Sequence, residues 1–153
     1  MCYNLCVVLY NIEMKVYVLE LENGKYYVGK TINVERRFKQ HLSGSSKWTR
    51  MYKPLRIINI IHECDGLDED KITVKYMIKH GIHNVRGGPY ISAKLSLEEI
   101  THIHRRIRMA MNLCLICGSS LHFASKCRKK YTLEEHCLIC NAKTHFTEDC
   151  EFN

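Results

Sequence analysis

The sequence has no apolar run that approaches the roughly 20 residues a membrane-spanning helix needs. The opening stretch, MCYNLCVVLYNIE, is apolar but lacks a basic N-terminal region and a small-residue cleavage site, so we do not expect a signal peptide. Met14 directly precedes the first strand pattern and is an alternative start to Met1. These features predict an intracellular protein of a reducing compartment (nucleus or cytoplasm), not secreted and without a membrane partner.

Acidic residues are outnumbered: 16 Asp and Glu stand against 23 Lys and Arg, for a net charge of +7. Residues 1–95 carry +6 of this charge and residues 96–153 carry +1. A basic surplus in the front segment favours a polyanionic partner. Charge alone does not separate nucleic acid from other anionic surfaces, and a merely soluble basic protein is the plainer alternative.

A disulfide framework is also missing, although the chain has nine Cys. Six of them lie with His in two regularly spaced clusters, which is typical of metal binding. The other three, Cys2, Cys6 and Cys64, fit a reducing compartment. With 153 residues, the chain has room for one core domain and an appendage.

The appendage is a tail with two copies of one unit, CLICGSSLHFASKC and CLICNAKTHFTEDC. Both read Cys-x2-Cys-x4-His-x4-Cys, and their first Cys residues are 23 positions apart. Three thiolates and one imidazole complete a tetrahedral zinc site with no open position, so each ion would be structural. A unit this short has almost no core, and metal binding would supply its folding energy. The predicted zinc ligands are Cys114, Cys117, His122 and Cys127 in the first unit, and Cys137, Cys140, His145 and Cys150 in the second.

The front domain centres on KVYVLELENGKYYVGKTINVERRFKQH, residues 15–41. Alternation over 15–21 and the aromatic run 26–28 predict two strands, and Asn23-Gly24 between them is a strong hairpin signal. Asn33 can cap a basic helix that follows. Tyr17 and Tyr27 would then lie on paired strands, with Arg37 and His41 one turn apart on the helix.

Further elements follow this unit. Residues 55–62, rich in Ile, predict a third and mostly buried strand. Asp65 or Asp68 can cap the next helix, which Gly81 would end. Ser96 to Glu99 form a capping box that opens a connecting helix to about residue 112.

Two stretches leave alternatives open. The run from Lys47 to Pro54 interleaves basic and aromatic residues, as base-stacking surfaces do, but Trp48 could equally pack in the core. Gly87-Gly88 either lets backbone approach a ligand or makes a turn.

Phenols beside a guanidinium and an imidazole suit phosphate chemistry. Tyr can donate or relay a proton, Arg can bind phosphate oxygens in a fork, and His can act as acid, base or orienter. At these residues the chain resembles the GIY-YIG nuclease family. Lys15-Val16-Tyr17 stands where that family has GIY, with Lys15 replacing Gly, and Tyr27-Val28-Gly29 stands where it has YIG. Arg37 precedes His41 by four residues, as the family's Arg often precedes a Tyr or His.

The resemblance implies an α+β fold: a small three-stranded antiparallel sheet flanked by helices, then the connecting helix and two zinc modules. We expect a nuclease domain at 14–95, the connecting helix at 96–112 and the zinc modules at 113–153. It also implies a catalytic set of Tyr17, Tyr27, Lys30, Arg37, His41 and Glu69.

One Mg²⁺ or Mn²⁺ ion would be held by Glu69, since the family places its metal-binding Glu early on the helix after the third strand. Asp70 and Glu63 are the alternative ligands.

The spacing of the tail units is similar to that of the retroviral-type CCHC zinc knuckle, which implies binding of single-stranded nucleic acid. Each unit has a Phe after its His, Phe123 and Phe146, available for base stacking. Lys126 and Arg128 to Lys130 add positive charge between the units. Leu121 and Thr144 stand where the family usually has Gly.

These observations predict a metal-dependent DNA endonuclease whose zinc knuckles aid nucleic-acid binding, with RNA or single-stranded nucleic acid as alternative substrates. Two other functions stay open. A non-catalytic nucleic-acid-binding protein is suggested by the altered first triplet, and a protein-interaction adaptor could dock a partner through its knuckles. The oligomeric state does not follow from the sequence.

Overall fold

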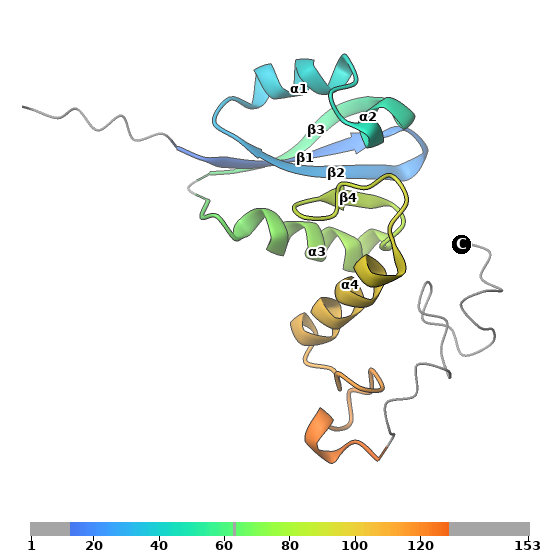
Figure 1. Ribbon diagram of the computed structural model, residues 1–153. Coiled ribbons are helices and arrows are strands. Elements are labelled where there is room, and N and C mark those ends of the chain that lie inside the picture. The colour runs from blue at the N-terminus through green and yellow to red at the C-terminus, as the bar shows by residue number, and fades with distance from the viewer. Residues whose placement is uncertain (1–12, 63, 129–153) are drawn as a thin grey trace, which may run out of the picture.

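The computed structural model describes residues 13–62 and 64–128 and shows a mixed α+β fold (Figure 1). The elements are β1 (Lys15–Leu21), η1 (Glu22–Gly24), β2 (Lys25–Thr31), α1 (Val34–Leu42), α2 (Lys47–Met51), β3 (Pro54–Ile61), α3 (Asp68–His80), β4 (Val85–Gly87), α4 (Leu97–Ala110) and η2 (Ala124–Lys126).

The predicted hairpin is confirmed. β1 and β2 pair antiparallel, with Tyr17 opposite Gly29 and Leu19 opposite Tyr27. Asn23 and Gly24 both adopt positive φ, +59° and +65°, which is why these two residue types are suited to this tight connection.

The sheet has four strands in the order β3-β1-β2-β4, so the prediction of three strands was wrong. The additional strand, β4, pairs parallel to β2, so the sheet is mixed rather than purely antiparallel. Only Val85, Arg86 and Gly87 form it. From the sequence alone, a segment this short next to two glycines is more easily interpreted as a turn than as a strand. The turn also exists: Gly87 and Tyr90 exchange backbone hydrogen bonds of 2.9 and 3.1 Å around Gly88-Pro89.

The prediction that β3 is mostly buried was also wrong. β3 is an edge strand of the described sheet, and Leu55, Ile58 and Ile60 have exposed fractions of 58%, 37% and 40%. A run of apolar residues indicates a strand, but a strand is covered on both faces only if other elements pack on it.

Helices cover both faces of the sheet (Figure 1). On one side, α3 and α4 pack on Val16, Val18 and Val28 through residues such as Met77 and Ile103. On the other side, the hairpin residues Tyr17, Leu19, Leu21 and Tyr27 pack with Val34 and Trp48. The strand alternation therefore divides the core into two clusters, and both phenols belong to the cluster beside α1 and α2.

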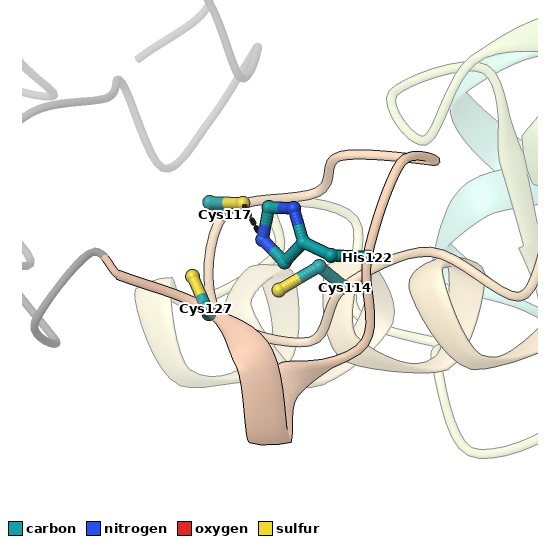
Figure 2. A group of neighbouring side chains, drawn as sticks. All are labelled: Cys114, Cys117, His122 and Cys127. Carbon is teal, nitrogen blue, oxygen red and sulfur yellow. Dashed lines mark hydrogen bonds between the residues drawn. The ribbon is translucent and has the colours of Figure 1, made fainter.

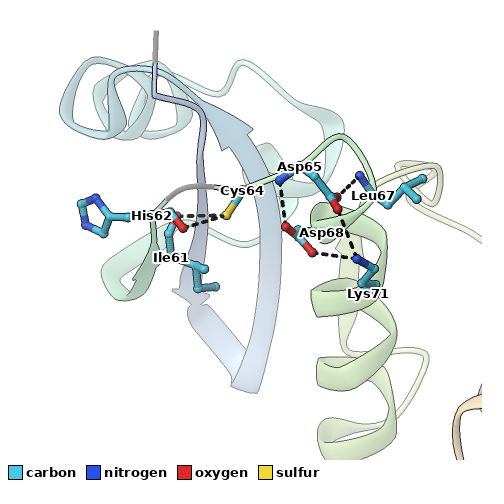
Figure 3. A network of polar contacts seen from close by, with 7 residues as sticks. All are labelled: Ile61, His62, Cys64, Asp65, Leu67, Asp68 and Lys71. Atoms are coloured by element: carbon cyan, nitrogen blue, oxygen red, sulfur yellow. Dashed lines mark hydrogen bonds and ion pairs between the residues drawn. The ribbon is translucent and has the colours of Figure 1, made fainter. Parts of the chain in front are cut away.

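Two of the predicted N-terminal caps are confirmed and one is not, and Gly81 ends α3 as predicted. The Asn33 side chain accepts from the Arg36 N–H at 2.9 Å, and Ser96 with Glu99 forms a capping box. α3 begins after Leu67, whose side chain makes no cap. Asp65 and Asp68 instead brace the loop before the helix: Asp65 accepts from the Leu67 N–H, and Asp68 from the Asp65 N–H (Figure 3).

Lys71 joins this loop network by contacting both Asp65 and Asp68, at 3.5 and 3.0 Å (Figure 3). The Cys64 thiol points back to the end of β3 and donates to the Ile61 carbonyl at 3.2 Å. The connection between β3 and α3 is therefore held by its own polar groups.

Trp48 lies in the core, with 3% of its surface exposed, so it is not a surface stacking residue. Its indole N–H donates to the Tyr26 carbonyl at 3.1 Å. The Arg86 guanidinium lies 4.3 Å from the centroid of the Trp48 ring, a cation–π geometry.

α4 is the longest described helix, and Ile100 and Ile103 from it are buried in the same core cluster as Met77 and Val28. The domain boundaries drawn from the sequence stay a prediction. Among the described residues, no helix combines the length and apolarity needed to cross a membrane.

We predict that Arg86→Lys destabilises the protein. The buried Arg86 guanidinium donates to four backbone carbonyls, those of Ile82, Val85, Ser92 and Ala93. A lysine keeps the charge but cannot reach all four carbonyls, so the free energy of unfolding should fall by about 2–4 kcal/mol.

Urea unfolding measures this change. Arg56→Lys is the matched control, because the Arg56 side chain is 73% exposed and pairs with the carboxylate of Glu20. An Arg86→Lys variant as stable as the control would contradict the structural role of Arg86.

Candidate active site

The candidate site forms where Tyr17 and Tyr27 lie side by side over Gly29. The two phenol rings are 6.4 Å apart between centroids and tilted by 37°. A Cβ added to Gly29 would collide with the Tyr17 hydroxyl and lie 2.9 Å from the Tyr27 ring. The glycine of the second triplet is therefore required by the space the two phenols occupy.

His41 packs against both phenols from α1. Its Nε2 lies 2.8 Å from the Tyr17 hydroxyl, and its ring centroid lies 4.6 Å from that of Tyr27. On the other side of the ring, Nδ1 lies 3.3 Å from the hydroxyls of Thr49 and Ser45. If Nδ1 carries the hydrogen and donates to these hydroxyls, Nε2 accepts the hydrogen of Tyr17.

The imidazole of His41 is neutral near pH 7. Burial, assisted by the positive charge of Arg37, lowers the pKa of His41 from 6.5 to about 4. A neutral ring with Nε2 toward Tyr17 can accept a proton, which the imidazolium could not do.

The phenols have the opposite shift. Burial, and then the neighbouring Tyr27, raises the pKa of Tyr17 well above its usual value, although Arg37 opposes this rise. Burial also raises the pKa of Tyr27, again against the influence of Arg37. Both hydroxyls are therefore protonated at neutral pH. Tyr17 is fully covered, and Tyr27 keeps 7% of its surface exposed.

Arg37 lies one turn before His41 on α1 and is partly exposed. Burial lowers the pKa of Arg37, but its interactions with the neighbouring phenols of Tyr17 and Tyr27 raise this pKa by more. Its Nη1 also donates to Gln40 at 3.1 Å. The side chain thus joins the phenols to the solvent-facing part of the site.

Glu69, in the first turn of α3, provides a carboxylate at the same place. Its Oε2 lies 3.4 Å from the Lys30 Nζ, and its side chain is 14% exposed. Its negative charge contributes to the raised pKa values of Tyr17 and Tyr27, which burial mainly causes. The structure therefore brings together all six residues of the predicted catalytic set; their chemical roles stay a prediction.

The alternative metal ligands differ in their surroundings. Asp70 points to α4 and pairs with the Arg106 Nη1 at 3.2 Å. Glu63 lies outside the described residues. Glu69 is thus the described carboxylate of the three that faces the phenols and Lys30.

The residues at this site fit a single divalent ion. Mg²⁺ and Mn²⁺ accept one or two carboxylates and complete their coordination with water and substrate phosphate oxygens. Glu69 supplies one such carboxylate beside a cation, Lys30, in the first turn of α3.

The first zinc unit has assembled ligands (Figure 2). One donor atom from each of Cys114, Cys117, His122 and Cys127 lies within 4.8 Å of the other three. The edges of a tetrahedral zinc site with Zn–S bonds near 2.3 Å are about 3.8 Å long, so these donors need to move by no more than about 1 Å relative to one another to hold the ion. The ligands of the second unit, Cys137, Cys140, His145 and Cys150, lie outside the described residues.

The first zinc unit is held against α4. Arg108 on that helix donates to the carbonyls of Leu115 and Ile116 at 3.1 and 3.3 Å. Gly118, with φ +72°, turns the chain beside the same guanidinium. These contacts fix the start of the unit to the last turn of α4.

Sequence reasoning missed Thr49, Ser45 and Arg106 at the site. Thr49 lies on α2, a five-residue helix without a strong sequence signal, and is 2% exposed. Arg106 lies on the connecting helix predicted after Ser96, where nothing in the neighbouring sequence marks it. Its contact with Asp70 joins positions 36 residues apart, which no local pattern reports.

Comparison with known proteins supports the same class. The model of the GIY-YIG catalytic domain matches residues 10–71. A UPF0213 protein of Halalkalibacterium halodurans is 34% identical over 83 residues, which cover 49% of this chain and 86% of the relative. One from Cupriavidus pinatubonensis is 48% identical over 44 residues, covering 28% of this chain and 49% of the relative. No solved structure matches the chain at a significant level.

The fold and the residues at its centre therefore define a protein with the GIY-YIG nuclease fold. The chain belongs to the GIY-YIG family, with UPF0213 proteins among its relatives. The names of those relatives state no activity, and the family match ends before the zinc cluster.

We predict that His41 makes stability depend on pH. Its folded pKa lies below its unfolded value, so the stabilisation is complete above about pH 6.5 and is lost as pH falls toward 4. Between pH 7 and pH 5 this loss should be about 2 kcal/mol of unfolding free energy.

Urea unfolding of wild type and His41→Gln at both pH values isolates this contribution, because zinc release affects both proteins alike. His62→Gln, at an exposed histidine, should keep the wild-type pH dependence. An identical pH dependence in wild type and His41→Gln would show that His41 is not the group responsible.

Proposed function

We propose that this protein is a metal-dependent endonuclease that hydrolyses phosphodiester bonds in DNA. The observation that carries the proposal is the convergence of Tyr17, Tyr27, His41, Arg37, Lys30 and Glu69, from β1, β2, α1 and α3, around the side-chain-free position Gly29.

Two cations serve the phosphate. Arg37, beside the phenols, would bind the phosphate oxygens and stabilise the charge that develops on them. The Lys30 side chain is 45% exposed and adds a second positive charge next to Glu69. Phosphate binding would draw both cations toward the substrate.

Proton transfer would use Tyr17 and His41. The Tyr17 hydroxyl gives its hydrogen to the neutral Nε2 of His41 as it takes a proton from the attacking water. The covered Tyr17 reaches water only when the side chains above it move on substrate binding. Tyr27, protonated and slightly exposed, would donate a hydrogen bond to the phosphate or to the water.

Glu69 would hold the Mg²⁺ or Mn²⁺ ion, which supplies charge neutralisation to the phosphate and to the leaving oxygen. The position of Glu69 next to the phenols, rather than that of Asp70 beside Arg106, supports this assignment.

The zinc units would bind nucleic acid. In the first, Phe123 is 68% exposed next to His122, and Lys126 and Arg128 are exposed nearby. An exposed ring among cations suits stacking on unpaired bases with phosphate neutralisation. Thiolate ligands also require reduced cysteines, which supports our proposal of an intracellular, reducing compartment.

A plasmid-cleavage assay with Mg²⁺ tests the catalytic proposal. We expect Arg37→Ala to lower the cleavage rate by on the order of a hundredfold or more, as loss of a charge-stabilising donor does. Glu69→Ala should abolish the metal-dependent cleavage.

Arg36→Ala and Glu98→Ala are the matched controls, since both alter exposed residues of the same charge outside the catalytic set. Mg²⁺-dependent cutting that survives both site substitutions would remove this mechanism. A wild-type protein that binds DNA without cutting it would favour the non-catalytic nucleic-acid-binding function.

The salt dependence of affinity for single-stranded DNA tests the role of the first zinc unit. Each phosphate contact contributes about 0.7 to the slope of log affinity against log salt, so Lys126→Ala with Arg128→Ala should reduce the slope by about 1.4. Lys75→Ala with Lys79→Ala removes the same charge from exposed positions on α3 as the control.

An equal decrease of the salt slope in both double variants would contradict a specific contribution of the first zinc unit to nucleic-acid binding. A wild-type protein without salt-dependent affinity for DNA or RNA would favour the protein-interaction adaptor.

A further inference from the structure

A second polar cluster lies directly behind Glu69. The neighbouring residue Asp70 turns away from the phenols and pairs with Arg106 of α4 at 3.2 Å. Both side chains are about 30% exposed, so the pair is partly buried. The pair joins the first turn of the helix that carries the candidate metal ligand to a helix beyond the family-matched residues.

The turn at Gly87-Gly88 closes over this cluster. Gly88 has φ +53°, and a Cβ there would lie 2.6 Å from the Asp70 carboxylate. The adjacent Tyr90 is buried and lies close to Arg106, whose charge partly offsets the rise in the Tyr90 pKa that burial causes. The Tyr90 hydroxyl also lies 3.0 Å from the His102 Nδ1.

The same helical turn is held from within by Thr73. The Thr73 hydroxyl donates to the Glu69 carbonyl at 2.7 Å, and Gly87 leaves no room for a side chain beside that hydroxyl. The hydrogen bond from Thr73 thus restrains the backbone of Glu69, and the ion pair with Arg106 restrains the side chain of Asp70. Rotation of this turn would move the Glu69 carboxylate relative to Lys30 and the phenols.

We propose that Arg106 is a positioning residue that, through Asp70, fixes the first turn of α3 so that the Glu69 carboxylate is oriented for a divalent cation. This inference rests on the proposed function, because it assigns Glu69 as the metal ligand. Arg106 touches neither the substrate nor the ion. It acts by restraining the neighbour of the residue that does.

The Mg²⁺ dependence of cleavage tests this role. In Arg106→Ala, the Mg²⁺ concentration that gives the half-maximal rate should rise about tenfold, which is the smaller of the losses in metal affinity seen when a residue supporting a metal ligand is removed. The rate at saturating Mg²⁺ should stay within about twofold of the wild-type rate. A general loss of structure would lower the saturated rate instead. Asp70→Asn should give the same shift, and the double variant should add little to either single change.

A second readout does not depend on activity. Electron paramagnetic resonance of Mn²⁺ added to the zinc-loaded full chain measures bound Mn²⁺, and the binding lost in Glu69→Ala is that at Glu69. Arg106→Ala should weaken this Glu69-dependent binding by the same factor. Arg105→Ala, at the exposed neighbouring arginine, is the matched control. Arg106→Lys keeps the charge and should restore part of the affinity, which separates positioning from misfolding.

The outcomes distinguish this inference from the proposed function. If wild type cuts DNA and binds Mn²⁺, but Arg106→Ala and Arg106→Lys behave as Arg105→Ala does, the positioning role is overturned and the endonuclease proposal stands. If Arg106→Ala lowers only the saturated rate, the positioning role is likewise overturned. If wild type neither cuts nor binds Mn²⁺, both proposals fail together.

Discussion

The packing of two phenols over a glycine is the constraint on which the site depends. Gly29 leaves the space in which the Tyr17 hydroxyl meets His41, and any larger residue would separate them. This arrangement buries an imidazole and two phenols together, so their pKa values move in opposite directions. The result is a neutral acceptor beside two protonated donors, with Arg37 and Glu69 supplying the charges at the boundary of the buried group.

α4 is the physical link between the front domain and the zinc tail. Ile100 and Ile103 bury one face of the helix in the core, Arg106 pairs with the N-terminal turn of α3, and Arg108 holds the first zinc unit. A helix expected from its sequence position to connect two parts is thus packed against both (Figure 1). A ligand bound by the first Cys and His cluster would therefore approach the candidate site in a restricted orientation.

The sequence predicted the parts of the site that follow from short-range patterns. The triplets around Tyr17 and Tyr27 and the spacing of Arg37 and His41 named residues that the fold brings together. It left Glu69 and Asp70 as alternatives, because adjacent helical residues point in different directions that only the packing of α3 specifies. The burial of β3 could not be predicted from the sequence either. This strand has the apolar composition of an inner strand, yet it lies at an edge of the described sheet.

The sequence by itself determined features whose energetics are local. Asn23-Gly24 fixes the hairpin through its backbone conformation. Asn33 and Ser96 fix the starts of two helices, because each side chain accepts a hydrogen bond from the backbone N–H three residues later. The spacing of Cys and His in the first unit places four ligands within reach of one ion. Only the tertiary structure decided the fourth strand, the buried positions of Trp48 and Arg86, and the pairing of Asp70 with Arg106. These depend on contacts between residues tens of positions apart, whose stability comes from the packed whole and leaves no pattern in a short segment.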